Sequence, residues 1–317
     1  MIGFIVVILG SLCLAGQNVL LRVMFAEGNI FGQFAWGGFV EATAANSLLI
    51  LQIRSVMILP IMLGLAPHLY PATWSTLQFA VQPSQRKLLA RAVASSSFLF
   101  LGLALLFVAI AYIPAGVATV LFFTHPVTTG LLSWKLFGDR PTLLRIGVMV
   151  MVLGGSALVM PSLSTATESQ SAIGVAAALG ASLAYSLQGI LAQTCFQRIH
   201  PVPFTVINFA VMAVWSTVCL IWFNFAIEPT AWGPIWIISG VAALLTLTGQ
   251  LLYNVGIHLV SAALMAIVAV SNPIFTATTA WIVLQEVLQE RQVLGIVLVV
   301  FGIIILGQER LQKQQDS

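Results

Sequence analysis

Charged residues are scarce in this sequence. Only 7% of the 317 residues are Asp, Glu, Lys or Arg, whereas 60% are hydrophobic. An ordinary soluble domain has about 25% charged residues, so this chain has too few of them to cover a water-facing surface. Its mean hydropathy of +1.05 means that much of its apolar surface has to be covered by lipid. These values exclude a soluble globule and predict a protein that crosses the membrane several times.

Segments of alternating polarity, paired cysteines and clustered basic residues are also missing. Outer-membrane barrels consist of short alternating segments, so their absence favours helical spans. The cysteines, Cys13, Cys195 and Cys219, stand alone in apolar sequence, so we expect neither disulfide framework, metal site nor cofactor. The 12 basic residues form no patch, which argues against a nucleic-acid partner. The expected partners are a lipid bilayer and a small-molecule substrate, and a homodimer stays open.

The charge-free intervals set the number of membrane spans. A helix needs about 20 mostly apolar residues to cross the hydrocarbon core. Counted in this way, the sequence predicts an all-α membrane protein with ten transmembrane helices. The predicted spans are 2–24, 44–66, 88–110, 114–137, 143–161, 172–194, 204–225, 234–256, 261–284 and 291–307.

The basic residues of the loops predict the orientation. If the N-terminus is cytoplasmic, nine basic residues lie inside and only Arg22 and Arg291 lie outside. The inside set is Arg86, Lys87, Arg91, Lys135, Arg140, Arg145, Arg198, Arg310 and Lys313. This is the positive-inside bias of membrane proteins. We therefore expect both termini, including the tail 308–317, in the cytoplasm. The expected location is the plasma (inner) membrane of a prokaryote.

An internal repeat divides the chain into two halves. A shift of 147 residues lays Val108–Pro126 on Val255–Pro273 without a gap. The same shift pairs Gly102 with Gly249, Thr129 with Thr276, and Asp139 with Glu286. The predicted repeats are 1–161 and 172–307, with five spans each, and an odd number of spans gives the halves opposite orientations. Inverted repeats are typical of secondary transporters, whose substrate site lies between the halves near the membrane midplane.

Each half ends in a similar order of features. A proline-containing helix is followed by an acidic residue, Asp139 or Glu286, and then by a last span rich in glycine. Gly16-Gln17-Asn18 in the first span and Arg54 in the second add to this pattern. The chain therefore resembles the EamA-type transporters of the drug/metabolite transporter superfamily. The resemblance implies a ten-helix exporter or facilitator of metabolites, amino acids or drugs, with a central cavity.

Two departures from that family pattern stand out. Residues 25–43 form a longer first loop than usual. In the second half, Asn208-Phe209 lies near the place that Arg54 has in the first half.

The eighth predicted span carries a stripe of polar residues. Thr246, Gln250, Asn254 and His258 follow one another at intervals of four, and four residues turn a helix by about 400°. The residues paired with them by the repeat are Leu99, Leu103, Phe107 and Ala111, all apolar. We predict that Gln250 and Asn254 line the substrate site. The alternative is hydrogen bonding between helices, worth about 0.6 kcal/mol per contact.

The repeat also pairs His125-Pro126 with Asn272-Pro273. Proline leaves the carbonyl four residues earlier without its usual donor, in the turn of Leu121 or Phe122 and in that of Val268 or Ala269. Thr129 and Thr276 lie one turn further along and make each face polar. Proline-interrupted segments at matching places in two halves indicate a transporter's site. The alternative is that the prolines only bend the helices.

The remaining candidates lie in other spans. Asn18 and Gln188 take similar positions after a Leu-Gly pair, and Tyr185 could stack on a flat ligand. Arg54 in the middle of a span costs about 2.5–3.5 kcal/mol to insert and needs a partner. It is interpreted as a substrate-carboxylate clamp, a gate or a structural contact to backbone carbonyls. Asp139 and Glu286 are expected to cap loops or pair with neighbouring arginines.

A transporter explains the repeat, the paired prolines and the polar stripe. The alternative is an intramembrane enzyme or a multispan protein that does not transport, but no catalytic residues are predicted because GxSxG, HExxH and paired carboxylates are missing. No Asp or Glu lies deep in a predicted span, which favours a neutral or zwitterionic substrate. We favour a facilitator; in a proton-coupled transporter His125 would carry the proton.

Overall fold

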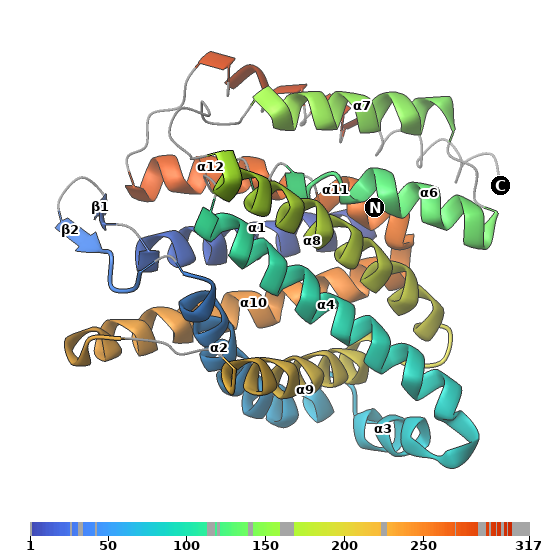
Figure 1. The fold of residues 1–317 in the computed structure, drawn as a ribbon. Helices are drawn as coiled ribbons and strands as arrows, with labels where there is room; N and C mark the ends of the chain where they lie inside the picture. Colours follow the sequence, from blue (N-terminus) through green and yellow to red (C-terminus); the bar gives the residue numbers. More distant parts are fainter. Residues whose placement is uncertain are drawn as a thin grey trace.

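The computed structural model describes residues 2–25, 27–30, 34–41, 43–112, 118, 121–138, 142–158, 168–222, 227–269, 271–284, 290–291, 293–295, 297–298, 301–302 and 304–305. Helices make up most of these residues, as the all-α prediction requires (Figure 1). The helices are α1 (Ile2–Phe25), α2 (Ala44–Leu69), α3 (Thr73–Val81), α4 (Arg86–Tyr112), α6 (His125–Phe137), α7 (Leu143–Leu158), α8 (Glu168–Cys195), α9 (Pro201–Leu220), α10 (Trp232–Val260), α11 (Ala262–Ala269) and α12 (Ser271–Leu284). Short 3-10 turns precede α4 (η1, Pro83–Gln85) and α10 (η2, Pro229–Ala231).

Seven helical segments of the described residues are long and apolar enough to cross a membrane. They are Ile2–Phe25, Ala44–Leu69, Pro83–Ile110, Ala172–Cys195, Pro201–Leu220, Pro229–Val260 and Ala262–Val283. Each coincides with a predicted span, so the prediction of an all-α, multi-pass membrane protein is confirmed. The predicted spans 114–137 and 143–161 contain the shorter helices α6 and α7. Most of 291–307 lies outside the described residues, so the count of ten stays a prediction.

Two elements were not predicted from the apolar runs. The long first loop contains a hairpin of β1 (Glu27–Ile30) and β2 (Phe34–Gly37), paired antiparallel. Its second strand is followed by Gly38 and Val40, whose amides donate to carbonyls of Val23 and Met24 at the end of α1. Between α2 and α4 the chain forms α3, where the Thr73 hydroxyl lies 3.0 Å from the Ala66 carbonyl oxygen of α2. Both elements join the ends of neighbouring spans.

Close backbone approach joins α1 to α10. A Cβ added to Gly10 would lie 3.2 Å from the Gly249 carbonyl oxygen, and one added to Gly249 would lie 3.1 Å from that of Gly10. Between α4 and α8, a Cβ on Gly102 would lie 3.4 Å from the Ala181 carbonyl oxygen. Lipid offers no hydrophobic drive for helices to associate, so close van der Waals packing at small residues has a large share in holding them together.

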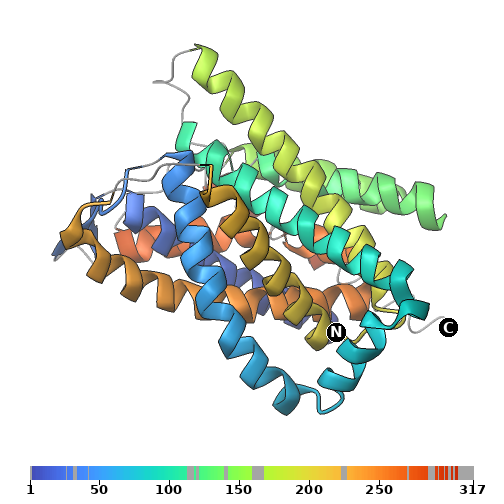
Figure 2. The ribbon, with the colours of Figure 1, turned by 60° about the horizontal axis from the view of Figure 1, so that its bottom comes forward.

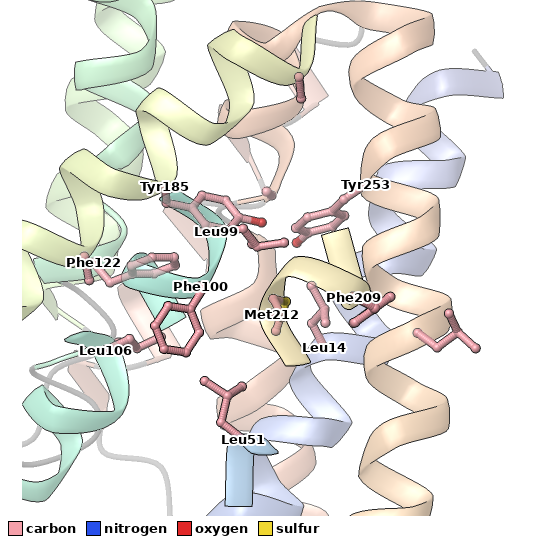
Figure 3. Close-up of a cluster of buried hydrophobic side chains, with 14 of the residues drawn as sticks. Leu14, Leu51, Leu99, Phe100, Leu106, Phe122, Tyr185, Phe209, Met212 and Tyr253 are labelled. Atoms are coloured by element: carbon pink, nitrogen blue, oxygen red, sulfur yellow. The ribbon is translucent and has the colours of Figure 1, made fainter. Parts of the chain in front are cut away.

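The other helices surround these two pairs. α2 packs against α9, α1 against α12, and α6 against α8 (Figures 1 and 2). α2 also contacts α10, and α9 contacts α4. The middle of the bundle holds apolar side chains from several helices, with Leu99, Phe209 and Met212 among them (Figure 3). A group of polar residues lies within this apolar interior.

Candidate functional site

A chain of polar side chains joins α2, α10 and α1. Arg54 of α2 donates through Nη2 to the Thr246 hydroxyl of α10. That hydroxyl lies 3.2 Å from Gln17 Oε1 on α1, and Gln17 Nε2 donates to Asn18 Oδ1 over 3.1 Å. Arg54, Gln17 and Thr246 are at most 6% exposed. These four residues, together with Asn272 and Thr276 of α12, which are described next, are called the amide network.

The amide network continues from α1 to α12. Asn18 Nδ2 donates to Asn272 Oδ1 at 3.2 Å and to the Thr276 hydroxyl at 3.5 Å. Asn272 Nδ2 donates to the Ser11 carbonyl oxygen at 2.9 Å. The structure thus brings together Asn18, Asn272 and Thr276, which the sequence analysis selected from opposite ends of the chain.

The guanidinium of Arg54 is only partly satisfied. The residue is 3% exposed, and its Nε and Nη1 have no hydrogen-bond partner among the described residues. The guanidinium carbon lies 6.0 Å from the ring centre of Phe107 on α4, within the range of a cation–π contact. Of the three interpretations of Arg54, the structural one named backbone carbonyls as partners, whereas the contact that the structure describes is to a side-chain hydroxyl, that of Thr246.

An aromatic cluster surrounds His125 at the start of α6. The ring centres of Phe122, Phe123 and Tyr185 lie 5.2, 5.4 and 5.0 Å from that of His125. His125 is 1% exposed, and its Nδ1 has no partner among the described residues. Tyr185 also lies beside the amide of Gln250. Figure 3 shows its hydroxyl directed toward that of Tyr253, which is 2.8 Å from Ser11 Oγ.

The residues of the polar stripe on α10 face different neighbouring helices. Thr246 contacts α1 and α2, whereas Gln250 lies next to Tyr185 of α8. One turn further, Asn254 Nδ2 donates to the Thr205 hydroxyl of α9 over 2.8 Å. Each step of four residues turns the stripe by about 40°. The structure therefore separates Asn254 from the amide network and places it where it joins two helices.

His258 ends the stripe at one end of the bundle. Its ring centre lies 6.4 Å from that of His200, which stacks on Tyr70 at 4.1 Å with the rings 4° from parallel. His200 precedes the span of α9, and burial together with the neighbouring His258 lowers the pKa of His200. This group lies apart from the amide network.

Side-chain hydroxyls donate hydrogen bonds to backbone carbonyls near the two prolines. Pro126 lies in the first turn of α6, and Pro273 in the first turn of α12. The Thr124 hydroxyl donates to the Leu121 carbonyl, and the Ser271 hydroxyl donates to the Val268 carbonyl, both at 2.8 Å. The residues of these two contacts correspond by the same shift of 147. The carbonyls of Leu121 and Val268 are therefore not left without a donor.

The other predicted site residues lie as follows. The Thr129 hydroxyl donates to the carbonyl of His125 in its own helix at 2.7 Å, so it does not join the amide network. Gln188 is 2% exposed, and its backbone carbonyl accepts from Ser95 of α4 at 2.8 Å. Asp139 and Glu286 lie outside the described residues. Within the part of the chain that the structure describes, no group of His, Cys, Asp or Glu could hold a metal ion.

The sequence analysis missed several members of the site. Gln17 was quoted only as part of a motif, and Thr246 only as the first residue of the stripe. Ser11, Phe122 and Phe123 belong to no polar stripe and to no motif repeated in the two halves, so neither criterion selects them. What these residues share is a position between helices far apart in the sequence, which requires the packing register to be known.

The arrangement suits binding better than covalent chemistry. Carboxamides can both donate and accept, and a guanidinium only donates. Gln17, Asn18 and Asn272 with Arg54 thus offer hydrogen bonds to a polar ligand, and the rings around His125 offer an apolar surface. The network contains no Ser, Cys or Thr nucleophile activated by a base within the described residues.

Comparisons with known proteins find similarity to membrane transporters. Residues 172–308 match the EamA-like transporter family. A Synechocystis sp. protein named as an uncharacterized transporter is 36% identical over 311 residues, which cover 98% of this chain and 94% of that protein. A solved structure titled only "Crystal structure of protein" superposes with a TM-score of 0.70 at 15% identity, over 99% of each chain. At that identity the likeness to the solved structure concerns the fold alone.

Proposed function

Because the chain belongs to the EamA-type transporters of the drug/metabolite transporter superfamily, we propose that it moves a small metabolite by alternating access. It is an integral, multi-pass membrane protein. The proposed site comprises the amide network and the rings around His125. The observation that carries this proposal is the hydrogen-bonded group of the half-buried Asn18 and Thr276 with the buried Asn272, which lies between spans from the two ends of the chain.

The proposal includes two inverted five-helix repeats, of residues 1–161 and 172–307. Helix packing supports it, because the contacts occur in matched pairs: α1 with α10 and α8 with α4, α1 with α12 and α8 with α6, and α2 with α10 and α9 with α4. The glycines Gly249 and Gly102, paired by the shift of 147, lie in the first of these matched interfaces. The equivalent hydroxyl contacts of Thr124 and Ser271 also support the repeat.

The depth of the site supports alternating access. Arg54, Thr246 and Asn272 fall near the middle of the candidate spans Ala44–Leu69, Pro229–Val260 and Ala262–Val283. Transporters built from inverted repeats bind substrate near the membrane midplane and open by rocking one repeat against the other. The deeply buried network members, Arg54, Thr246 and Asn272, would then reach water only when the helices separate.

We further propose a neutral or zwitterionic substrate, an exporter or facilitator mode of transport, a prokaryotic plasma membrane and cytoplasmic termini. The chemistry of the network supports the first, since its hydrogen-bonding groups are carboxamides and hydroxyls. Facilitated diffusion fits the absence of Asp and Glu deep in the predicted spans, since proton-coupled transporters usually use an intramembrane acid or histidine. His125 is the alternative proton carrier.

Sealed membrane vesicles test the proposed function. Uptake and efflux of a metabolite panel are measured with and without an imposed pH gradient, using vesicles that contain the protein or lack it. We expect saturable, protein-dependent flux of at least one member, without accumulation beyond equilibrium. Protein-dependent chemical conversion of a panel member without flux would instead indicate an intramembrane enzyme.

A further inference from the structure

Arg54 is a buried cation whose hydrogen bonds are incomplete. The residue is 3% exposed, and its Nη2 donates to the Thr246 hydroxyl. Its Nε and Nη1 have no partner among the described residues. Buried polar groups in proteins are nearly always hydrogen-bonded, so an unpartnered guanidinium inside a membrane span needs a physical reason.

The residues around Arg54 do not neutralise its charge. No described residue forms an ion pair with it, and besides the Thr246 hydroxyl it has the ring of Phe107, 6.0 Å from the guanidinium carbon. The hydroxyl of Thr246 passes the contact on to Gln17, which carries no charge either. The charge is therefore held by one hydroxyl and one aromatic ring, both weaker partners than a carboxylate.

The amide network brings no negative charge to Arg54. Gln17 accepts from Thr246 through Oε1 and donates through Nε2 to Asn18, and both side chains are neutral. Asn272 lies in the first turn of α12, at the end of a helix where the backbone dipoles are positive. This surrounding favours an anionic group, and the single cation matches one negative charge.

We propose that Arg54 anchors the carboxylate of the transported substrate. The Nε and Nη1 hydrogens, which have no partner among the described residues, donate to its oxygens, while the amide network and Gln250 contact the rest of the molecule. The inference rests on the proposed transport function and deepens it, because among neutral and zwitterionic substrates it selects zwitterions whose negative group is a carboxylate. Inorganic phosphate is disfavoured, since a dianion would leave one charge uncompensated.

A structural role for Arg54 gives different expectations. If the residue only held α2 against α10, the bond to Thr246 would stabilise the ligand-free protein, and its loss would affect all ligands alike. An anchor behaves in the opposite way. It leaves an uncompensated charge in the empty protein, and its loss affects only ligands that carry a carboxylate.

Ligand binding to the purified, full-length protein in detergent separates these roles. The probes are the standard neutral L-amino acids, each beside its carboxamide, with inorganic phosphate as a third arm. Binding is followed by thermal shift and tryptophan fluorescence. We expect at least one carboxylate to bind while its amide and phosphate do not, and Arg54→Gln to weaken that binding by about 30-fold or more. Arg54→Lys, which keeps the charge but not the planar fork, should weaken it by an intermediate factor.

Asn208→Ala is the matched control. Asn208 is fully buried on α9, near the place that Arg54 takes on α2, and its Nδ2 also has no partner among the described residues. Its loss should leave the preference for carboxylate over amide unchanged. Wild-type affinity for the carboxylate in Arg54→Gln, binding of amides only, or a preference for phosphate would each overturn the proposal.

A second measurement needs no ligand. Arg54→Met removes the charge and keeps a flexible side chain, so the ligand-free variant should melt about 2 °C or more above the wild type. A lower melting temperature would show that Arg54 stabilises the empty protein and would overturn the proposal even if no panel member binds. Conversely, carboxylate binding that depends on Arg54 without any vesicle flux would retain the anchor and refute the transport function.

Discussion

Two helix interfaces at matching places in the proposed repeat use different chemistry. At α6–α8 the contacts are made by hydroxyls: Thr124 with Ser182 and Thr128 with Ser186. At α1–α12 they are made mainly by carboxamides, those of Asn18 and Asn272. Two interfaces with matching packing are therefore held by different groups, and each of them joins the two halves of the proposed repeat.

The difference lies in how completely each interface satisfies itself. Hydroxyls on helices can bond to a carbonyl of the preceding turn, as Ser186 does to Ser182 and Thr129 to His125. A carboxamide has two donor hydrogens and an acceptor oxygen and cannot be satisfied within its own helix. The hydroxyls of the first interface thus also bond within their own helices, whereas the amide N–H groups of Asn18 and Asn272 donate to the other helix. This contrast leads us to expect unequal effects of equivalent substitutions.

The largest effect is expected from Asn18→Leu. The change removes both donors to α12 and the acceptor for Gln17 while keeping a similar volume. Vesicle flux should fall by about tenfold or more, as expected for the loss of about 1.4 kcal/mol of substrate interaction. Thr128→Val at the hydroxyl interface is the control and should change flux by less than about twofold, because Ser186 can still bond to its own helix. Equal losses in the two variants would remove the distinction between the interfaces.

The stripe of α10 gives the next comparison. Gln250→Leu should lower flux severalfold with little change in melting temperature, since Gln250 lies beside Tyr185 in the proposed site. Asn254→Leu should chiefly lower stability, by about 1 kcal/mol, because it breaks the bond to Thr205 between α10 and α9. Flux per folded molecule and thermal melting are measured for both. If Asn254→Leu loses flux at full stability, both residues belong to the site.

The paired glycines test the packing at the matched interfaces. A Cβ on Gly249 would lie 2.6 Å from Leu14 Cγ, whereas one on Gly102 would lie no closer than 3.4 Å to its neighbours. Gly249→Ala should therefore destabilise by about 1–3 kcal/mol through overpacking. Gly102→Ala should stay within about 0.5 kcal/mol of the wild type, as a substitution in ordinary contact does. A larger loss for Gly102→Ala would mean that α4 and α8 approach more closely than α1 and α10.

Orientation is tested by labelling in a background without Cys13, Cys195 and Cys219. A single cysteine at Gln85 should react with an impermeant reagent only from the cytoplasmic side, and one at Glu168 only from outside. Reaction of the Gln85 position from outside would contradict both the positive-inside assignment and the inversion of the two halves.

The smallest effect is expected on the coupling of transport to a pH gradient. In a facilitator, His125→Gln should alter apparent affinity by no more than severalfold and leave the response to a pH gradient unchanged, because His125 contacts rings and no acid among the described residues. Counterflow and gradient-driven uptake are compared for variant and wild type. Uphill accumulation that disappears in the variant would make His125 the proton carrier.

The spans could be predicted because hydropathy depends only on local sequence. Seven of them appear as long apolar helices, while the hairpin β1–β2 and helix α3 could not be found by that criterion. The polar character of Asn18, Asn272 and Thr276 was equally visible. Their mutual contacts were not, because they depend on the register of α1 against α12. Thr129, predicted beside the substrate, bonds to the carbonyl one turn earlier in its own helix, a local contact that hydroxyls on helices often make.

Substrate protection of a single cysteine tests most directly whether ligand occupies the carboxamide interface. Thr276 and Thr128 are both half-buried and lie in the two interfaces compared above. In the cysteine-free background, we predict that a transported substrate slows alkylation of Thr276→Cys severalfold and leaves that of Thr128→Cys unchanged. Protection of Thr128→Cys alone, or of neither cysteine at saturating substrate, would contradict the placement of the site between α1 and α12.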